Sequence, residues 1–207
     1  MYAQVLQGNA RDPGAVRAAL DRWVQDLGPG AIGWLGTTAG VTDDGQLVAL
    51  IRFDSATSAR HNGERAEQAA WMSELRDFCD GELVVADSSR VLVDVVADPD
   101  AASFVQVIQG RSKDVHREFD LLEQNSGAWT SFRPDIVASL AMLHEDHTWT
   151  MALYFTSEAA AREGEAKEPP AEVAEQMAAM DQLSDGEPEF FDLRQPWLYR
   201  TPAVPGV

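Results

Sequence analysis

The sequence has little of what marks a secreted protein or a nucleic-acid-binding protein. Its 207 residues include a single cysteine, Cys79, so an intramolecular disulfide framework is excluded and a reducing compartment is indicated. Basic residues are scarce, because 16 Lys and Arg stand against 34 Asp and Glu, and the formal net charge is −18. Such a surface repels nucleic-acid phosphates and anionic lipid headgroups. We therefore expect neither nucleic acid nor a membrane as a partner.

Long apolar stretches are also missing. No apolar run reaches the roughly 20 residues that a membrane-spanning helix needs. Residues 1–12 have neither the basic start nor the apolar stretch of a signal peptide, so a cytoplasmic protein is expected. The apolar share of 45% is nevertheless normal for a globular protein, and a sizeable core can form.

Motifs that bind cofactors or metals are equally scarce. The sequence has no phosphate-binding loop, no Ser-His-Asp signature and no pair of cysteines separated by two residues. His144 and His147 lie beside Glu145 and Asp146, a set of residue types that could bind a metal. These four residues fall in a predicted hairpin turn, so an ordinary solvent-exposed turn is favoured over a metal site. We expect no cofactor and no metal.

Two segments of the chain are similar in sequence. The run Gln-Val-Leu-Gln-Gly at 4–8 returns at 106–110 as Gln-Val-Ile-Gln-Gly, an offset of 102 (106 − 4). The same offset relates further identical residues: Asp12 and Asp114, Leu20 and Leu122, Phe53 and Phe155, Ser55 and Ser157. The similarity predicts an N-terminal repeat at 1–98 and a C-terminal repeat at 103–207.

Each repeat is predicted to contain strand, helix, strand, strand, helix and strand. In the first repeat, Asp12 is a good N-cap with Pro13 at the first helical position, and Ser55 is a good N-cap for the second helix. The second helix of the C-terminal repeat must be interrupted at Pro169–Pro170. The β-rich stretch 90–96 is expected to link the repeats along a sheet edge.

This order of elements predicts the fold class. A βαββαβ unit forms a four-stranded antiparallel sheet with both helices on one face. The other face must be buried, and in a tandem repeat the second copy is the obvious partner. We therefore predict an α+β protein in which two fused ferredoxin-like units form a pseudo-dimeric α/β barrel, either as a monomer or as a homodimer.

Short motifs in the first repeat resemble a known superfamily. They are Asp12-Pro13-Gly14, the turn at Gly30, Phe53-Asp54-Ser55 and Ala59-Arg60-His61. Together with the order of elements, they resemble the dimeric α/β barrel superfamily, and within it the antibiotic biosynthesis monooxygenase-like domains. The resemblance covers 1–98 and extends through the repeat to 103–200. It implies a ligand pocket between the sheet and the helices of one unit, and cofactor-independent oxygenation of polycyclic phenols or anthrones.

The resemblance also indicates candidate site residues in the first repeat. Members often have a histidine where this chain has His61, whereas the second repeat has Glu163 there (61 + 102). As the catalytic residue, His61 would take a proton from a phenol; the alternative is a polar histidine at a helix break. Asn62 would orient a substrate oxygen, or it would end a helical turn. The haem-degrading branch fits less well, because no histidine follows Trp71 between 72 and 80.

Aromatic and amide residues complete the list of candidates. Trp71, Trp34 and Trp23 would make an aromatic wall for a flat ligand, with Trp71 and Trp34 as substrate-binding residues, whereas aromatic residues at such spacing mostly belong to a core. Gln4 and Gln7 recur as Gln106 and Gln109, which suggests a symmetric polar site inside the barrel, but the favoured interpretation is that these amides satisfy one another.

Two functions from different classes remain open. The first is a cofactor-independent monooxygenase-like enzyme acting on a small aromatic molecule of the phenol or anthrone type. The second is a non-catalytic small-molecule-binding or scaffold protein of the same fold. In both, the expected partner is a small-molecule ligand.

Overall fold

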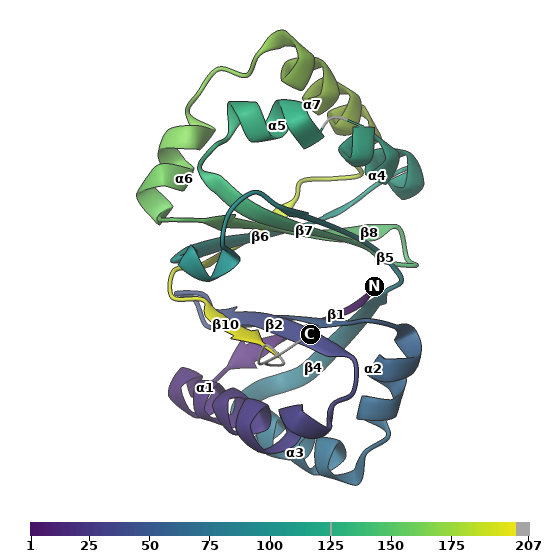
Figure 1. Ribbon diagram of the computed structural model, residues 1–207, viewed down its shortest axis with the longest axis vertical. Helices are drawn as coiled ribbons and strands as arrows, with labels where there is room; N and C mark the ends of the chain where they lie inside the picture. Colours follow the sequence, from purple (N-terminus) through teal and green to yellow (C-terminus); the bar gives the residue numbers. More distant parts are fainter. Residues whose placement is uncertain (125, 202–207) are drawn as a thin grey trace, which may run out of the picture. The chain divides into compact units, whose positions relative to one another are not determined.

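Two ferredoxin-like units make up the chain in the computed structural model, which describes residues 1–124 and 126–201 (Figure 1). Among the described residues, unit 1 contains 1–89 and 196–201, and unit 2 contains 90–195. The α+β class and the ferredoxin-like organisation are therefore confirmed. No helix among the described residues is both long and apolar enough to cross a membrane.

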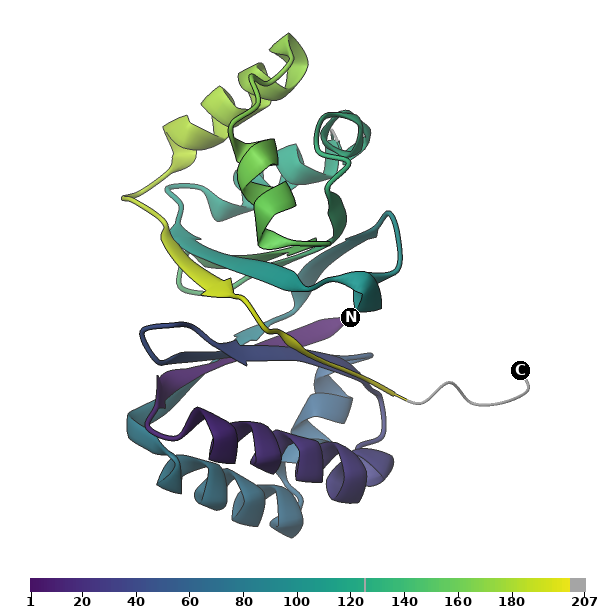
Figure 2. The same ribbon diagram turned by 90° about the vertical axis from the view of Figure 1, so that its left-hand side faces the viewer.

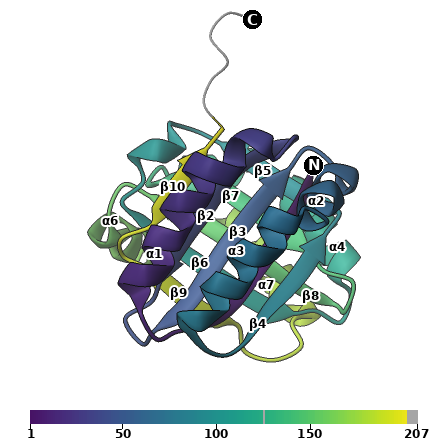
Figure 3. The ribbon, with the colours of Figure 1, turned by 90° about the horizontal axis from the view of Figure 1, so that it is seen from below.

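Unit 1 is a five-stranded antiparallel sheet in the order β10-β2-β3-β1-β4. Figure 3 shows α1 and α3 running across one face of this sheet. The elements are β1 (Tyr2–Ala10), α1 (Pro13–Arg22), the π-helical turn η1 (Trp23–Leu27), the 3-10 turn η2 (Gly28–Gly30), β2 (Trp34–Val41), β3 (Gln46–Phe53), α2 (Ala56–Gly63), α3 (Ala66–Asp77), β4 (Cys79–Ser88) and β10 (Trp197–Arg200).

Unit 2 has a sheet of the same kind, in the order β5-β7-β8-β6-β9. Figure 2 shows its helices, coloured teal to green, on one side of that sheet. The elements are β5 (Arg90–Val95), the 3-10 turn η3 (Pro99–Ala101), β6 (Phe104–Arg111), α4 (Val115–Gln124), α5 (Ser126–Phe132), β7 (Ile136–Leu143), β8 (Thr148–Phe155), α6 (Glu158–Glu165), α7 (Ala171–Leu183) and β9 (Glu189–Leu193).

The two units have equivalent registers. Gln4 of β1 lies opposite Ile51 of β3, and Gln106 of β6 lies opposite Leu153 of β8, so each pair is displaced by 102. The second predicted helix is split in both units, into α2 and α3 and into α6 and α7. In unit 2 the split contains Pro169–Pro170, as expected of residues that cannot continue a helix.

One strand from each repeat belongs to the sheet of the other unit. β5 follows β4 in the chain but pairs with β7, from Arg90 opposite Leu143 to Val95 opposite Ala138. β10 follows β9 but pairs with β2, from Trp197 opposite Ala39 to Arg200 opposite Gly36. The stretch 90–96 is thus an edge strand of unit 2. The predicted repeats 1–98 and 103–207 were defined by sequence similarity. The compact units have different bounds, because the last strand of each repeat pairs with the sheet of the other unit.

Side chains of β10 fix it to unit 1. Trp197 is buried in the core that contains Leu6, Val16 and Leu75. The Tyr199 hydroxyl donates a hydrogen bond to Asp21 Oδ1 at 2.7 Å. Burial raises the pKa of Tyr199 well above its usual range, and the bond to Asp21 adds to this effect.

Equivalent serines cap α2 and α6, so their replacement tests the local signals directly. The Ser55 hydroxyl accepts a hydrogen bond from the Ser58 N–H at 3.1 Å, and the Ser157 hydroxyl accepts one from Ala160 at 3.1 Å. We expect Ser55→Ala and Ser157→Ala each to lower the free energy of unfolding by about 1 kcal/mol in urea denaturation. Serine-to-threonine variants keep the hydroxyl and serve as controls; alanine variants as stable as the parent would contradict the capping role.

Candidate functional site

Three tryptophans meet in unit 1 between the helices and the sheet. Trp23 opens the π-helical turn η1, Trp34 opens β2 and Trp71 lies on α3. The rings of Trp23 and Trp34 are edge-to-face with centroids 5.0 Å apart, and those of Trp23 and Trp71 are tilted at 6.3 Å. The structure therefore brings the three predicted wall residues together, with Trp23 in contact with both Trp34 and Trp71. We call these three residues the tryptophan cluster.

Every indole N–H of the tryptophan cluster has a partner within unit 1. Trp23 Nε1 donates to Gln68 Oε1 at 2.6 Å, Trp34 Nε1 to Thr37 Oγ1 at 3.0 Å, and Trp71 Nε1 to the Ala19 carbonyl at 2.9 Å. Trp34 is only 3% exposed. These contacts are typical of core aromatics, whose polar atoms are satisfied when buried.

Asn62 is buried near the end of α2 and contacts a neighbouring arginine. Its side-chain carbonyl accepts a hydrogen bond from Arg65 Nη1 at 3.0 Å. The same Arg65 nitrogen donates a hydrogen bond at 3.1 Å to the carbonyl of Leu27, which is the last residue of η1. Asn62 therefore holds Arg65 against the end of the π-helical turn, and through it fixes the segment that begins with Trp23.

His61 lies one residue before Asn62, but its side chain is exposed on α2. The structure thus brings Trp34 and Trp71 together, places Asn62 at the end of η1, and leaves His61 at the surface.

The repeated amides Gln4 and Gln106 each have a carboxylate partner in their own unit. Gln4 Nε2 donates to Asp87 Oδ1 at 2.9 Å, from β1 to β4. Gln106 Nε2 donates to Asp192 Oδ1 at 3.1 Å, from β6 to β9. The repeated glutamine therefore connects a central strand to the edge strand beside it.

The prediction of a solvated turn at 144–147 is wrong for its first residue, His144. His144 is buried, and its Nε2 is 3.0 Å from the Thr150 hydroxyl. The other three residues are exposed, and His147 has a φ of 66° that suits the turn. No cluster of three or more metal-binding side chains is found among the described residues.

Solved structures share this arrangement of elements. A candidate monooxygenase from Lactobacillus acidophilus has a TM-score of 0.70 at 12% identity, over 95% of this chain and 98% of that chain. An anthrone oxidase-like protein has a TM-score of 0.68 at 11% identity, over 96% and 90%. The chain therefore shares the fold of these solved structures, with two ferredoxin-like units in one chain.

The same fold also occurs in a protein described by a regulatory role. The structure of a major regulator of staphylococcal pathogenesis has a TM-score of 0.54 at 9% identity, over 99% of this chain and 100% of that chain. No protein-family model and no curated protein matches the sequence. At such low identities the likeness concerns the fold.

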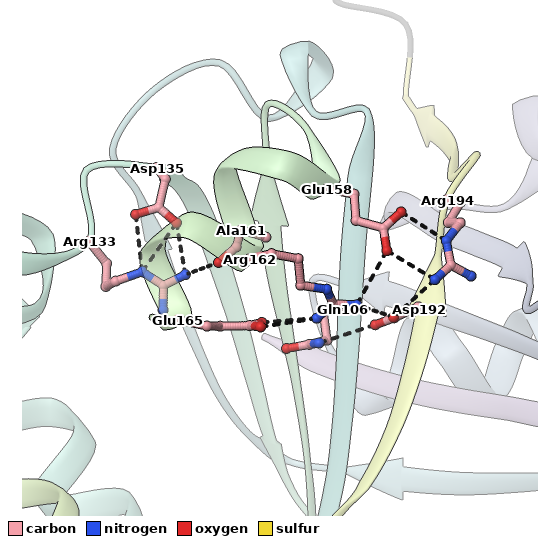
Figure 4. A network of polar contacts seen from close by, with 9 residues as sticks. All are labelled: Gln106, Arg133, Asp135, Glu158, Ala161, Arg162, Glu165, Asp192 and Arg194. Atoms are coloured by element: carbon pink, nitrogen blue, oxygen red, sulfur yellow. Dashed lines mark hydrogen bonds and ion pairs between the residues drawn. The ribbon is translucent and has the colours of Figure 1, made fainter. Parts of the chain in front are cut away.

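Figure 4 shows a polar network on α6 and β9 of unit 2. Arg162 contacts the Asp192 carboxylate, which also accepts the bond from Gln106. Further ion pairs complete it: Arg162 with Glu158 (3.4 Å) and Glu165 (3.1 Å), and Arg194 with Glu158 (2.8 Å). Each charged group in the network has an opposite charge beside it, so the network positions β9. Sequence reasoning missed it, although acids four residues before and three after Arg162 are a recognisable helix pattern.

Proposed function

We propose that the protein is a cofactor-independent monooxygenase-like enzyme that acts on a small aromatic molecule of the phenol or anthrone type. The observation that carries the proposal is the tryptophan cluster, built on a π-helical turn in the layer between the helices and the sheet of unit 1. π-Helical turns inside helices are frequent at functional sites. Three indole rings offer flat apolar surfaces to a flat aromatic ligand. The anthrone oxidase-like structure supports the same substrate class through its fold.

In this proposal each predicted residue has a role. Trp34 and Trp71 bind the aromatic body of the substrate, and Asn62 orients its oxygen. His61, the single histidine of unit 1, accepts the proton as the substrate becomes an anion. The anion gives an electron to O₂ and a C–O bond forms. For an anthrone, a methylene group becomes a carbonyl, one oxygen atom enters the product, and the other leaves as water with the two hydrogens.

Oxygen uptake by the full chain tests the proposal, with phenols and anthrones as substrates. General-base catalysis contributes about 10²- to 10⁴-fold, so we expect His61→Ala to lower the rate of uptake at least about 100-fold without changing the melting temperature. His116→Ala is the matched control, because His116 is an exposed histidine on α4 of unit 2. Uptake that persists in His61→Ala would remove His61 from the mechanism.

A non-catalytic binding protein is the second candidate. It is favoured by the internal partners of all three indole N–H groups and by the exposed position of His61. The fold of the staphylococcal regulator supports it as well. Thermal stabilisation by an aromatic compound, with no oxygen uptake, is the outcome that selects this function.

A further inference from the structure

The edge strands of the two sheets differ in how well they are protected from pairing with another molecule. An edge strand leaves the N–H and C=O groups of one side without a strand partner, so a strand of another chain can pair there unless charges, bulges or a short length prevent it. The edges are β10 and β4 in unit 1, and β5 and β9 in unit 2. Among these described strands, β5 is the one without such protection.

β4 is protected by an irregular backbone and by charge. Its register against β1 shifts between Gln7 and Asn9, and Gly81 has a φ of 75° in the same segment. Bulges of this kind bend an edge strand and interrupt its pairing. Three exposed acidic residues also lie on β4: Asp80, Glu82 and Asp87. A second copy of this strand would therefore meet both a bend and further acidic residues.

β9 and β10 are protected by their short length and by charged residues at their ends. β9 has five residues and β10 has four. The exposed Glu189 begins β9, and Arg194 follows this strand in ion pairs with Glu158 and Asp192. β10 ends in the exposed Arg200. Few backbone groups and a charge at the edge leave little for another strand to pair with.

β5 is regular and apolar along one exposed face. Its six residues pair with β7 without any shift of register. Val93 is 38% exposed and Val95 is 56% exposed, and both share a face with Val91 because alternate residues of a strand point to the same side. Valine is also among the residues that favour strands most. An exposed apolar edge of this kind is a predicted site of pairing with another chain.

The equivalent edge of unit 1 shows that the fold does not require an exposed valine here. Val95 lies opposite Ala138, and Arg200 of β10 lies opposite Gly36. Gly36 and Ala138 are equivalent at the offset of 102, so Arg200 and Val95 occupy equivalent positions. Both side chains are exposed. The charge that protects the edge in unit 1 is thus replaced by an apolar side chain in unit 2.

The sequence of β5 is complementary to itself in the antiparallel direction. Around a two-fold axis at Val93, the Val93 side chains of two copies lie opposite one another, and Val91 of each copy lies opposite Val95 of the other. Such cross-strand pairs of β-branched residues are favourable. Leu92 then lies opposite Asp94, so no charged residue of β5 is directly opposite a like charge. A two-fold contact of this type closes after two copies.

We propose that two copies of the chain pair through their β5 edges into a homodimer. The five-stranded sheet of unit 2 then continues into that of the second copy, with β5 beside β5. The contact covers the exposed surfaces of Val93 and Val95 and gives partners to the outward backbone groups of both strands. Two strands of six residues bury less surface than a standard interface, so the dimer dissociates at micromolar concentrations. This surface is independent of His61 and of oxygen chemistry.

Sedimentation of the full chain from about 1 to 100 μM tests the proposal. A salt concentration of about 0.15 M screens the net charge of −18. We expect the molar mass to rise from that of one chain toward that of two. Val93→Lys should keep the mass at one chain throughout, because two lysines would lie opposite one another at the axis. Val84→Lys is the matched control, since Val84 is 58% exposed on the protected edge β4 and its replacement should leave dimerisation unchanged.

Cysteine cross-linking tests the register and does not depend on the lysine variants. Val93→Cys should form an intermolecular disulfide under mild oxidation, because position 93 lies opposite itself. Val95→Cys should not, because its copy in the second chain lies about 13 Å away along the strand. Cys79 is buried and does not compete. A single-chain mass at every concentration, a dimer that persists in Val93→Lys, or equal cross-linking of the two cysteine variants would each overturn the proposal.

Discussion

Replacing Trp34 by alanine is expected to lower the free energy of unfolding by about 3–5 kcal/mol, the usual cost of removing a large buried aromatic side chain. Trp34 is 3% exposed, and its ring packs edge-to-face on Trp23. Its loss would leave a cavity beside Ala31, Phe53 and Ala59, which are buried around Trp34 in the core of unit 1. The Thr37 hydroxyl would also lose the donor that now satisfies it. Chemical denaturation monitored by circular dichroism measures the loss.

The size of this effect separates the two interpretations of Trp34. A core residue gives the full loss, and Trp34→Phe recovers much of it because a ring still fills the space. A residue that lines an open ligand site packs on one side only. If Trp34→Ala lowers the free energy of unfolding by less than about 1 kcal/mol, the interpretation of Trp34 as part of a substrate-binding wall is favoured. An aromatic ligand should then stabilise the parent protein but not the variant.

Asp135→Ala is expected to be about as damaging, by about 3–5 kcal/mol, because it leaves a buried guanidinium without its partner. Arg133 and Asp135 are 8% and 10% exposed at their side chains and form a bidentate pair at 2.8–3.1 Å. Arg133 also donates to the Ala161 carbonyl at 3.3 Å and lies over the ring of Phe155. The arginine therefore cannot move to solvent without disrupting α6.

The exposed ion pair of Arg11 and Asp80 is the matched control. Its side chains are 61% and 64% exposed and 3.5 Å apart, so Asp80→Ala should cost about 1 kcal/mol or less. Urea denaturation of both variants gives the comparison. A double replacement of Arg133 and Asp135 by leucine and valine should be less destabilised than Asp135→Ala alone, because no charge remains buried. Equal losses for Asp135→Ala and Asp80→Ala would show that the Arg133 pair is effectively solvated.

Much of the fold follows from short-range signals in the sequence. Asp12, Ser55 and Ser157 begin helices because their side chains accept hydrogen bonds from N–H groups three residues away, which is a local property. The exchange of β5 and β10 is different. A four-residue strand such as β10 has no periodicity to read, and its pairing with β2 joins residues more than 150 positions apart. Sequence alone therefore predicts the elements of each sheet better than its edges.

The candidate sites show the same division. Trp34 and Trp71 were recognisable as aromatic residues of one layer, but their hydrogen-bond partners depend on tertiary contacts. The sequence did not predict that Glu118 on α4 is buried, because an acidic residue in the first turn of a helix is normally exposed and favoured by the helix dipole. One signal was available: the offset of 102 makes Glu118 equivalent to Val16, a member of the predicted apolar stripe.

The exchanged strands make the two halves of this chain depend on each other, because each sheet contains one strand from the other half. A fragment ending at residue 98 would contain β5 without β7, and β2 without β10. The second fragment would have the opposite deficits. Neither fragment can complete its own sheet, yet each has the strand that the other lacks. Cleavage of the 96–103 connection should therefore yield two pieces that remain associated and reassemble on mixing, a natural pair for fragment complementation.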